Sequence, residues 1–465
     1  MNYSAESATR DVAKWIVARD RKAVLSPQAL QFSEISVIDT IACMFAGLIE
    51  PGPEHLKNAT FTDPKMPASV IGLNASATAV DAARINGTSA HMLDFDDGSA
   101  VCGGHPSTVV VPTILALAEK HGLNGLDLLD AHIIGWDTML LVGAMVKPYM
   151  AARGYHVTSA VGVVAAAAAG ARLLKLNVDQ TATALGIAAS SGSGIRANFG
   201  TDMKPYHAGC ASAAAVLAVE LAATGFTAAH NILEAKDGFV SVLGDEKARE
   251  GVRAHVDKLL RGDVSIEKDH PFIKFFACCH STHSSIEAAI KIRPKVIGNL
   301  EAIQEILVET YPLSKLFLIH PRPTTGLQAK FSMEACIALA LVDGKAGPAE
   351  FTDKSVGRRA VQQLIPKVKY TVSDRYDDAH NQQKTQPGNV TVISTLGTFR
   401  EEVSDPYGAQ LRPCTQEDVC EKFRTGAMGR LSNSEIAIAD QMLGNIRAIE
   451  DIRKLGGLLR GRPSG

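Results

Sequence analysis

From residue 5 to about residue 240, apolar side chains recur three and four positions apart, which predicts amphipathic or buried helices. Helices are expected at Ala5–Ala18, Ser26–Ala46, Ala79–Met92, Ser107–His121, Leu126–Met145, Thr158–Leu174, Val178–Ser190 and Ala208–Thr224. Ser26-Pro27 and His105-Pro106-Ser107 are typical helix starts. Glycine and alanine fill residues 158–170 and 208–223, so facing helices can approach closely. We therefore expect a tightly packed all-α core with little room for a β-sheet.

The pattern changes after about residue 268. Alternating, β-branched segments predict strands at Ile303–Tyr311, Lys367–Ser373 and Asn389–Gly397. Helical spacing lies between them and returns near the C-terminus, at Met333–Val342, Ser355–Ile365, Thr415–Phe423 and Asn433–Leu455. The expected fold is mainly α with an inserted α+β domain. Its segments are an all-α domain (1–268), an α+β lid domain (269–406) and C-terminal helices that return to the all-α domain (407–465).

Composition narrows the class of protein. A chain of 465 residues with 46% hydrophobic and 21% charged residues is typical of a globular protein with two or three domains. A formal net charge of −2 argues against a nucleic-acid partner. The first 25 residues lack the pattern of a signal peptide, and Val157–Gly170, the most lipid-like stretch, is short for a membrane span. We therefore expect no membrane association. The eight cysteines form no C-x-x-C pair, which favours a reducing, cytoplasmic location.

Ionisable side chains gather in four stretches where helices begin or end, three of which contain glycines. They are HMLDFDDGSAVCGGHPS (91–107), RGYHVTS (153–159), SGSGIRANFGTDMKPYHAGC (191–210) and IKFFACCHSTH (273–283). Side chains and free backbone N–H groups can converge on a ligand at such places. These stretches are therefore the candidate functional segments.

Lys204 and His207 lie three residues apart, so both can face one side of a helix that begins near Pro205. A buried lysine suits a carboxylate ligand, and a histidine can exchange a proton near neutral pH. A solvated Lys204 and a His207 that only starts the helix fit the spacing equally well. Arg196 is the charged residue of the preceding loop, which lacks the G-x-G-x-x-G spacing and the βαβ context of a dinucleotide-binding loop.

The segment ACCHSTH contains several residue types that bind metals. Adjacent Cys278 and Cys279 rarely chelate one tetrahedral ion, and no second cluster has zinc-like spacing. His280 and His283 have the spacing of a helix start, with one of them facing a pocket. We therefore expect no metal at this segment.

Three aspartates, Asp94, Asp96 and Asp97, form a D-x-D-D pattern that lacks the other positions of a calcium-binding loop. Aspartates at helix ends most often cap turns or the next helix. We expect one of the three, Asp94, to orient a histidine or lysine, and the other two to act as caps.

Several motifs resemble those of the MmgE/PrpD family. In order along the chain they are HMLDFDD followed by GHPS, then RGYH, NFGT-x-M-K-P-x-HAG, KFFACCHSTH, GLQAKFSMEACIALAL (326–341) and DPYGAQLRPCTQEDVCEKF. The likeness thus covers nearly the whole chain, and NFGT-x-M-K-P-x-HAG is the most distinctive part. The family includes 2-methylcitrate dehydratases, cis-aconitate decarboxylases and iminodisuccinate epimerases.

The resemblance implies a large all-α domain made from both chain ends, with an inserted α+β lid. It also implies a homodimer that needs no metal or organic cofactor and binds small di- or tricarboxylates in a basic cleft between the domains. Carried over motif by motif, the cleft residues are Asp94, His105, His156, Lys204 and Lys274.

Two positions depart from the pattern of animal decarboxylases of the family. Those enzymes carry threonine just after the double aspartate, where this chain has Gly98, and histidine five residues after the second lysine, where it has Cys279. Either His280 replaces that histidine after a local shift, or the chain carries out different chemistry. The exact polycarboxylate therefore stays open.

The family's reactions all build up negative charge on a carbon beside a carboxylate. We expect Lys204 and Lys274 to stabilise that charge and His105 to bind a second carboxylate. His156, held in one tautomer by Asp94, is the expected proton-transfer residue.

Dehydration needs a further acid for the leaving hydroxyl group, which His280 or His207 can supply, and Arg196 is a further candidate for substrate binding. The leading function is a cofactor-independent lyase that dehydrates or decarboxylates a citrate-, 2-methylcitrate- or cis-aconitate-type substrate. The alternatives are an epimerase or isomerase of a dicarboxylate such as iminodisuccinate, and a scaffold that binds polycarboxylates without catalysis.

Overall fold

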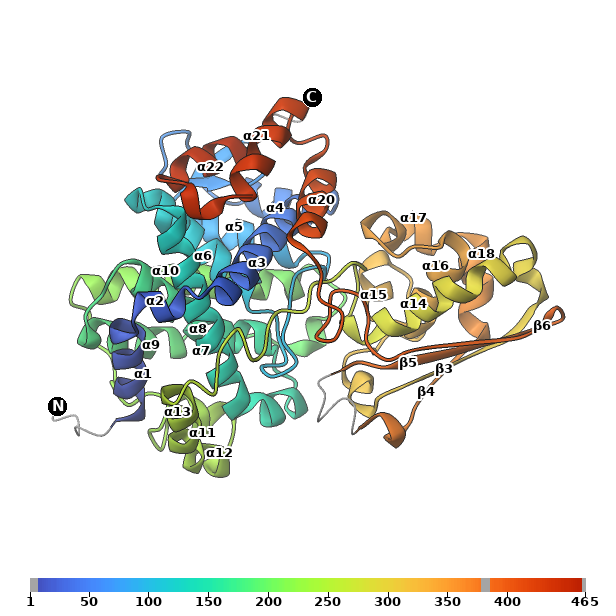
Figure 1. The fold of residues 1–465 in the computed structure, drawn as a ribbon, viewed down its shortest axis with the longest axis horizontal. Helices are drawn as coiled ribbons and strands as arrows, with labels where there is room; N and C mark the ends of the chain where they lie inside the picture. The colour runs from blue at the N-terminus through green and yellow to red at the C-terminus, as the bar shows by residue number, and fades with distance from the viewer. Residues whose placement is uncertain (1–6, 378–384, 462–465) are drawn as a thin grey trace.

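The computed structural model describes residues 7–377 and 385–461. Figure 1 shows a larger part built of helices and a smaller part in which helices lie against a sheet. The fold is thus mainly α with a smaller α+β part, as the sequence predicts.

The larger part contains most of the helices. They are α1 (Ala8–Ala18), α2 (Arg21–Val24), α3 (Pro27–Ala46), α4 (Gly52–Asn58), α5 (Ala79–His91), α6 (Ser107–His121), α7 (Gly125–Ala152), α8 (Val157–Leu173), α9 (Val178–Ala189), α10 (Met203–Ala223), α11 (Phe239–Leu243), α12 (Glu246–Glu250), α13 (Val252–Leu260), α20 (Gln416–Ala427), α21 (Asn433–Leu443) and α22 (Ile452–Leu459). Ser26 caps α3 by accepting a hydrogen bond from the backbone N–H of Ala29.

Four expectations for this part need correction. Helix α7 ends at Ala152, seven residues after the expected end at Met145. Helix α10 begins at Met203, five residues before the expected start, because Pro205 fits in the first turn of a helix. The expected single helix Asn433–Leu455 is two helices, α21 and α22, separated by a 3₁₀ turn. A small antiparallel sheet, β1 (Ala68–Val70) with β2 (Ala75–Ala77), is present where none was expected. The expected helix start at residues 5 and 6 lies outside the described residues.

The smaller part contains a four-stranded sheet in the order β4-β3-β5-β6. Its strands are β3 (Ile303–Thr310), β4 (Val368–Val372), β5 (Gly388–Ser394) and β6 (Gly397–Val403). Strands β3 and β4 are parallel, and the other neighbours are antiparallel. The helices of this part are α14 (His283–Ile292), α15 (Gly326–Ala329), α16 (Met333–Asp343), α17 (Asp353–Val356) and α18 (Arg359–Leu364). In Figure 1, α14 and α16 lie along one side of the sheet.

Two clusters of buried apolar side chains correspond to these parts. The larger cluster combines residues from Ala8 to Ile273 with residues from Cys414 to Leu459. The second contains residues between Ala277 and Val403, with three additions from the helical part. The C-terminal helices α20–α22 therefore share a core with the N-terminal helices, beside which they lie in Figure 1.

Glycines bring two helices of the larger part close together. A Cβ atom at Gly209 of α10 would lie 2.2 Å from the carbonyl oxygen of Arg84 in α5, and one at Gly87 of α5 would lie 3.1 Å from the Cα of Gly209. Such close approach needs residues without a side chain. It places the end of α5, and Asp94 just beyond it, next to Lys204 in the first turn of α10.

By length and composition alone, three helices can cross a membrane: Pro27–Ile49, Gly125–Met150 and Met203–Ala223. Of the most apolar window in each, 83%, 94% and 61% is buried inside the protein. Packing within the fold therefore accounts for most of their apolar character. The stretch that is most lipid-like by sequence, Val157–Gly170, is not among these three helices and belongs to the shorter helix α8.

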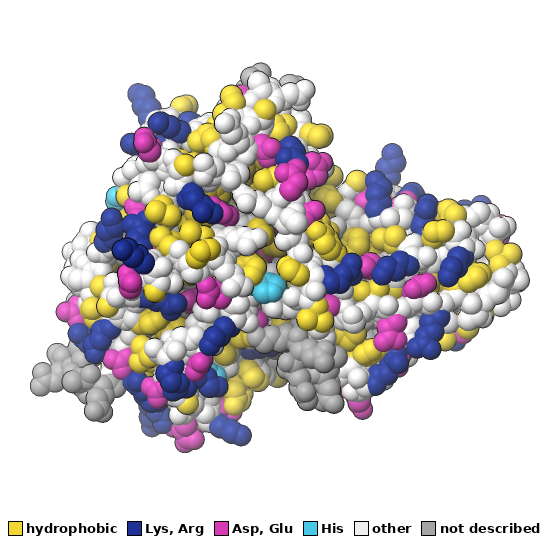
Figure 2. All heavy atoms as spheres, viewed as in Figure 1, with side chains coloured by type: hydrophobic (Ala, Val, Ile, Leu, Met, Phe, Trp, Pro, Cys, Tyr) yellow, Lys and Arg dark blue, Asp and Glu magenta, His cyan; other side chains and the backbone are white. Residues whose placement is uncertain are grey.

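Basic and acidic side chains are interspersed over the face drawn in Figure 2. This mixture agrees with the small net charge of −2. Strong binding of nucleic acid usually needs a basic surface. The expectation that nucleic acid is not a partner stays a prediction.

Candidate active site

A cavity of about 130 Å³ lies where the helical part meets the smaller part. Its walls include Lys204, His105 and His156 from the helical part, and Lys274 and His280 from the segment that leads into α14. The four candidate functional segments of the sequence thus meet at one place. Arg196 also lines the cavity, and its side chain is partly exposed.

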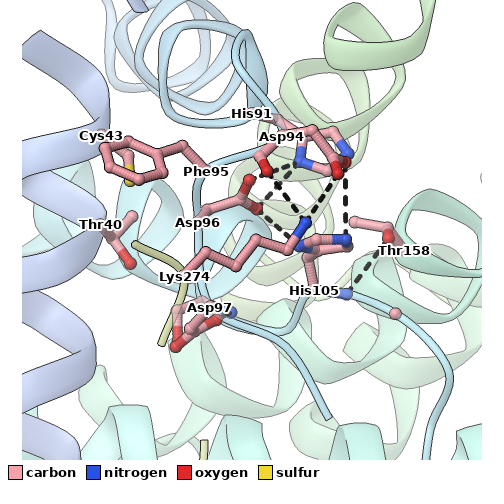
Figure 3. Close-up of polar contacts among 12 residues, drawn as sticks. Thr40, Cys43, His91, Asp94, Phe95, Asp96, Asp97, His105, Thr158 and Lys274 are labelled. Atoms are coloured by element: carbon pink, nitrogen blue, oxygen red, sulfur yellow. Dashed lines mark hydrogen bonds and ion pairs between the residues drawn. The ribbon is translucent and has the colours of Figure 1, made fainter. Parts of the chain in front are cut away.

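Asp94 is held between two buried lysines. Lys204 Nζ donates a hydrogen bond to Asp94 Oδ1, and Lys274 Nζ lies 2.6 Å from Asp94 Oδ2. Lys274 also donates to the backbone oxygens of Asp94 (2.9 Å) and Cys278 (3.2 Å). Figure 3 shows the contacts between Lys274 and Asp94. Burial opposes ionisation of Asp94, but the two ammonium groups hold its pKa well below the usual value. The carboxylate is therefore charged, and the alternative of a solvated Lys204 is wrong.

The backbone of Asp94 has a left-handed conformation, with φ of 52°. Outside glycine such a conformation costs about 1 kcal/mol or more, and aspartate is among the residues that tolerate it best. The surrounding structure must therefore keep Asp94 in place. The turn that it makes carries the chain from α5 into the cavity wall.

Asp96 contacts two histidines. Its oxygens lie 2.9 and 3.0 Å from His91 Nδ1, and one lies 3.2 Å from His105 Nδ1. Burial lowers the pKa of His91 to about 4, so its neutral ring donates the Nδ1–H to Asp96. On the other edge of its ring, His105 Nε2 lies 3.7 Å from Asp94 Oδ1. Figure 3 shows the contacts that join the His105 ring to the two carboxylates.

The aspartates therefore differ from expectation in one respect. Asp97 caps α6, because it accepts hydrogen bonds from the backbone N–H and the hydroxyl group of Ser107. Asp96 was expected to be a cap as well, and this was wrong. Its charge is satisfied by the two imidazole rings of His91 and His105 instead.

His156 is not held by Asp94, contrary to expectation. Its Nδ1 lies 3.3 Å from His207 Nδ1, and its ring stacks at 5.4 Å on that of His91. Burial, reinforced by neighbouring basic groups, holds the pKa of His156 well below its usual value. His156 is therefore a neutral imidazole beside the cavity, one that can accept a proton. His207 lies with Lys204 in the first turn of α10, as the sequence spacing predicts.

His280 and Phe272 form a second wall of the cavity. Their rings are parallel, with centroids 3.9 Å apart. The Phe272 ring lies over Gly98, where a Cβ atom would be only 2.4 Å from its Cζ. Gly98 is thus the partner of Phe272, which explains why a larger residue is absent there. Both His280 and Cys279 line the cavity, so a histidine does reach it from this segment.

One group of described residues has the ligand types and spacing of a metal site. The donor atoms of His91, Asp96 and His105 lie within 4.8 Å of one another. The hydrogen bond from the neutral His91 ring to Asp96 explains their closeness without an ion. The expectation that this protein uses no metal stays a prediction.

The structure brings Asp94, His105, His156, Lys204 and Lys274 together, along with His280 and His207. Sequence reasoning missed His91, Asp96 and Phe272 as parts of the site. For His91 the signal was its place in the same ionisable stretch, five residues before Asp96. For Phe272 no local signal exists, since its role depends on Gly98, 174 positions away in the chain.

The sequence matches a known family along most of its length. The MmgE/PrpD N-terminal domain matches residues 10–251, and the MmgE/PrpD C-terminal domain matches residues 276–445. The chain therefore belongs to the MmgE/PrpD family.

Curated relatives share most of its length. A cis-aconitate decarboxylase of Aspergillus terreus (strain NIH 2624 / FGSC A1156) is 27% identical over 453 residues, which cover 92% of this chain and 91% of that protein. The cis-aconitate decarboxylase of Homo sapiens is 27% identical over 391 residues, or 82% of this chain and 79% of the relative. A cis-aconitate decarboxylase-like protein of Aspergillus oryzae is 24% identical over 483 residues, 98% of both chains.

Proposed function

We propose that this protein is a lyase that decarboxylates or dehydrates a small polycarboxylate of the cis-aconitate, citrate or 2-methylcitrate type. The observation that carries the proposal is the cavity whose wall holds an ionised aspartate bonded to two buried lysines, with His105 and His156 beside it. The curated relatives, which are named cis-aconitate decarboxylases, support the same reaction class. At 24–27% identity they leave the substrate to experiment.

Lys204 is the cation best placed to meet the substrate. Among the described residues, Asp94 is the one hydrogen-bond acceptor of its ammonium group, which leaves two N–H bonds for substrate oxygens. Loss of carbon dioxide or of a proton leaves an electron pair on the carbon next to a carboxylate. A fixed cation in a site shielded from water stabilises that charge as it develops.

His156 supplies the proton-transfer step. In dehydration the neutral ring removes a proton from carbon, and the hydroxyl group leaves as water with a proton from His280 or His207, whichever has been protonated before the step. In decarboxylation the bond to the leaving carboxylate breaks, carbon dioxide departs, and the carbon takes a proton from an imidazole that was protonated beforehand. His105, oriented by Asp96, faces a second carboxylate of the substrate, and Arg196 lies at the cavity wall to contact a further one.

Proton NMR in heavy water tests this proposal. Purified protein is mixed separately with cis-aconitate, citrate, 2-methylcitrate and iminodisuccinate, and a Lys204→Met variant serves as the control. A new vinylic product from one substrate, absent with the variant, is the expected result and names the substrate. Deuterium uptake without net conversion would replace the lyase with an epimerase, and a silent panel would contradict the proposed substrates.

A further inference from the structure

A lysine from the C-terminal part of the chain lies behind the candidate active site. Lys422 of α20 is buried, and its ammonium group donates hydrogen bonds to Asp39 Oδ1 (2.6 Å), the carbonyl oxygen of Phe95 (2.7 Å) and that of Lys274 (3.0 Å). Its Nζ also lies 3.6 Å from the centroid of the Phe95 ring. All three of its N–H bonds are thus used within the protein.

Two of these acceptors belong to the backbone around the Asp94–Lys274 ion pair. Phe95 directly follows Asp94, whose left-handed φ of 52° needs support from its surroundings. The other carbonyl belongs to Lys274 itself. Lys422 therefore joins the two chain segments that carry the partners of the ion pair. These segments lie 180 residues apart in sequence.

The ion pair of Lys422 with Asp39 serves to place backbone groups more than to stabilise the fold. A buried ion pair contributes little net stability compared with apolar side chains of similar size, because both charges lose their hydration. An apolar side chain at position 422 would fill the same space but would leave both carbonyl oxygens without a donor. Asp39, which is fully buried, balances the charge that these hydrogen bonds require.

We propose that Lys422 is a positioning residue, which fixes the position of Asp94 relative to Lys274 through the carbonyl groups of Phe95 and Lys274. It does not line the cavity and so acts on the substrate only through these residues. Because Lys204 is bonded to the same Asp94 carboxylate, a shift of Asp94 also moves the cation that faces the substrate. The C-terminal helices thereby complete the site built by the N-terminal part.

The test uses a double variant that removes both charges, Lys422→Met with Asp39→Asn. Lys422→Met alone leaves a buried carboxylate unpaired and is expected to fold poorly. The matched control is Arg172→Met with Asp130→Asn. Arg172 pairs with Asp130 at 2.7 Å and donates to the carbonyl oxygens of Ile16 and Arg19, so it resembles Lys422 but lies outside the cavity wall.

Two measurements decide the proposal. Hydrogen–deuterium exchange of the full-length protein is expected to be at least tenfold faster in residues 92–98 and 271–279 of the Lys422 double variant, and unchanged there in the control. Turnover per folded molecule is expected to fall about 10- to 100-fold with KM within threefold, since small misplacement of catalytic groups lowers kcat strongly. Exchange at the wild-type level in both segments, or turnover within twofold of wild type, would overturn the proposal.

Only the turnover measurement rests on the proposed function. A wild-type protein without activity toward every substrate of the panel contradicts that function and leaves the exchange measurement valid. Faster exchange confined to the two segments then supports the positioning role, and unchanged exchange refutes it.

Discussion

Substitution of Gly98 by alanine tests whether the Phe272 ring in the cavity wall needs a residue without a side chain at position 98. The backbone of Gly98 is not left-handed, so its conformation suits any residue. A Cβ atom there would lie 2.4 and 2.6 Å from two carbons of the Phe272 ring, well inside the roughly 3.5–4.0 Å of a favourable contact. Phe272 is 7% exposed and stacks on His280 at 3.9 Å, so the ring has little room to retreat. Overpacking of this kind destabilises a protein by about 1–3 kcal/mol.

A double-mutant cycle with Phe272→Ala measures this effect through thermal unfolding midpoints. Gly98→Ala is expected to lower the midpoint in the wild-type background and much less in Phe272→Ala, because the second substitution removes the ring that clashes and leaves only the 3.2 Å contact of the Cβ atom with the carbonyl oxygen of Gly104. Gly298→Ala is the control, since a Cβ atom at Gly298 meets nothing within 4 Å. The reasoning is refuted if Gly98→Ala leaves the midpoint unchanged, or if the loss is equally large without the Phe272 ring.

Three further substitutions test the site and the core. Lys274→Met removes the donor to the carboxylate and the backbone oxygen of Asp94, which are both buried. The free energy of unfolding should fall by about 3 kcal/mol, and a wild-type thermal midpoint would contradict this prediction. His156→Ala should lower turnover by about 10²–10⁴-fold, and near-wild-type turnover would remove His156 from proton transfer. Burial raises the pKa of Glu119 to about 7. The protonated side chain therefore stabilises the folded state at low pH, and this stabilisation is lost as pH rises from about 4.5 through about 7. Glu119→Gln should therefore flatten the pH dependence of the unfolding midpoint, by the equivalent of about 3 kcal/mol over that range, and equal slopes would refute the assignment.

Periodicity predicted the presence of the long helices, although one end of α7 and one end of α10 were missed by seven and five residues. It predicted short or exposed elements poorly. Helices such as α6 and α9 have apolar residues at helical spacing and were expected within one residue of their ends. Strand β6 was missed because it lies at the edge of the sheet, where four of its seven residues are exposed and its sequence, GTFREEV, is mostly polar. Short helices such as α4 and α12 have too few turns to show a period.

Local sequence identified the residues of the site but not their partners. Asp94 and Lys204 belong to separate motifs and meet across 110 residues because α5 and α10 pack closely. The role of Asp96 was misjudged, since a capping aspartate and one that contacts two imidazoles look alike in sequence. Lys422 gave no signal, because its three acceptors come from three distant segments.

The two lysines of the site, which sequence alone treats as equivalent, have different environments. Lys274 has three protein acceptors for its three N–H bonds and is 1% exposed; burial opposes its charge, but Asp94 and Asp96 raise its pKa above the usual value. It therefore fixes Asp94 and can reach a substrate only by releasing a protein partner. Lys204 shares Asp94 but lies near two aromatic rings, 5.5 Å from the Phe199 centroid and 5.1 Å from that of Phe331, which are far weaker partners than a carboxylate. Substrate affinity should therefore depend mainly on Lys204, and the integrity of the site on Lys274.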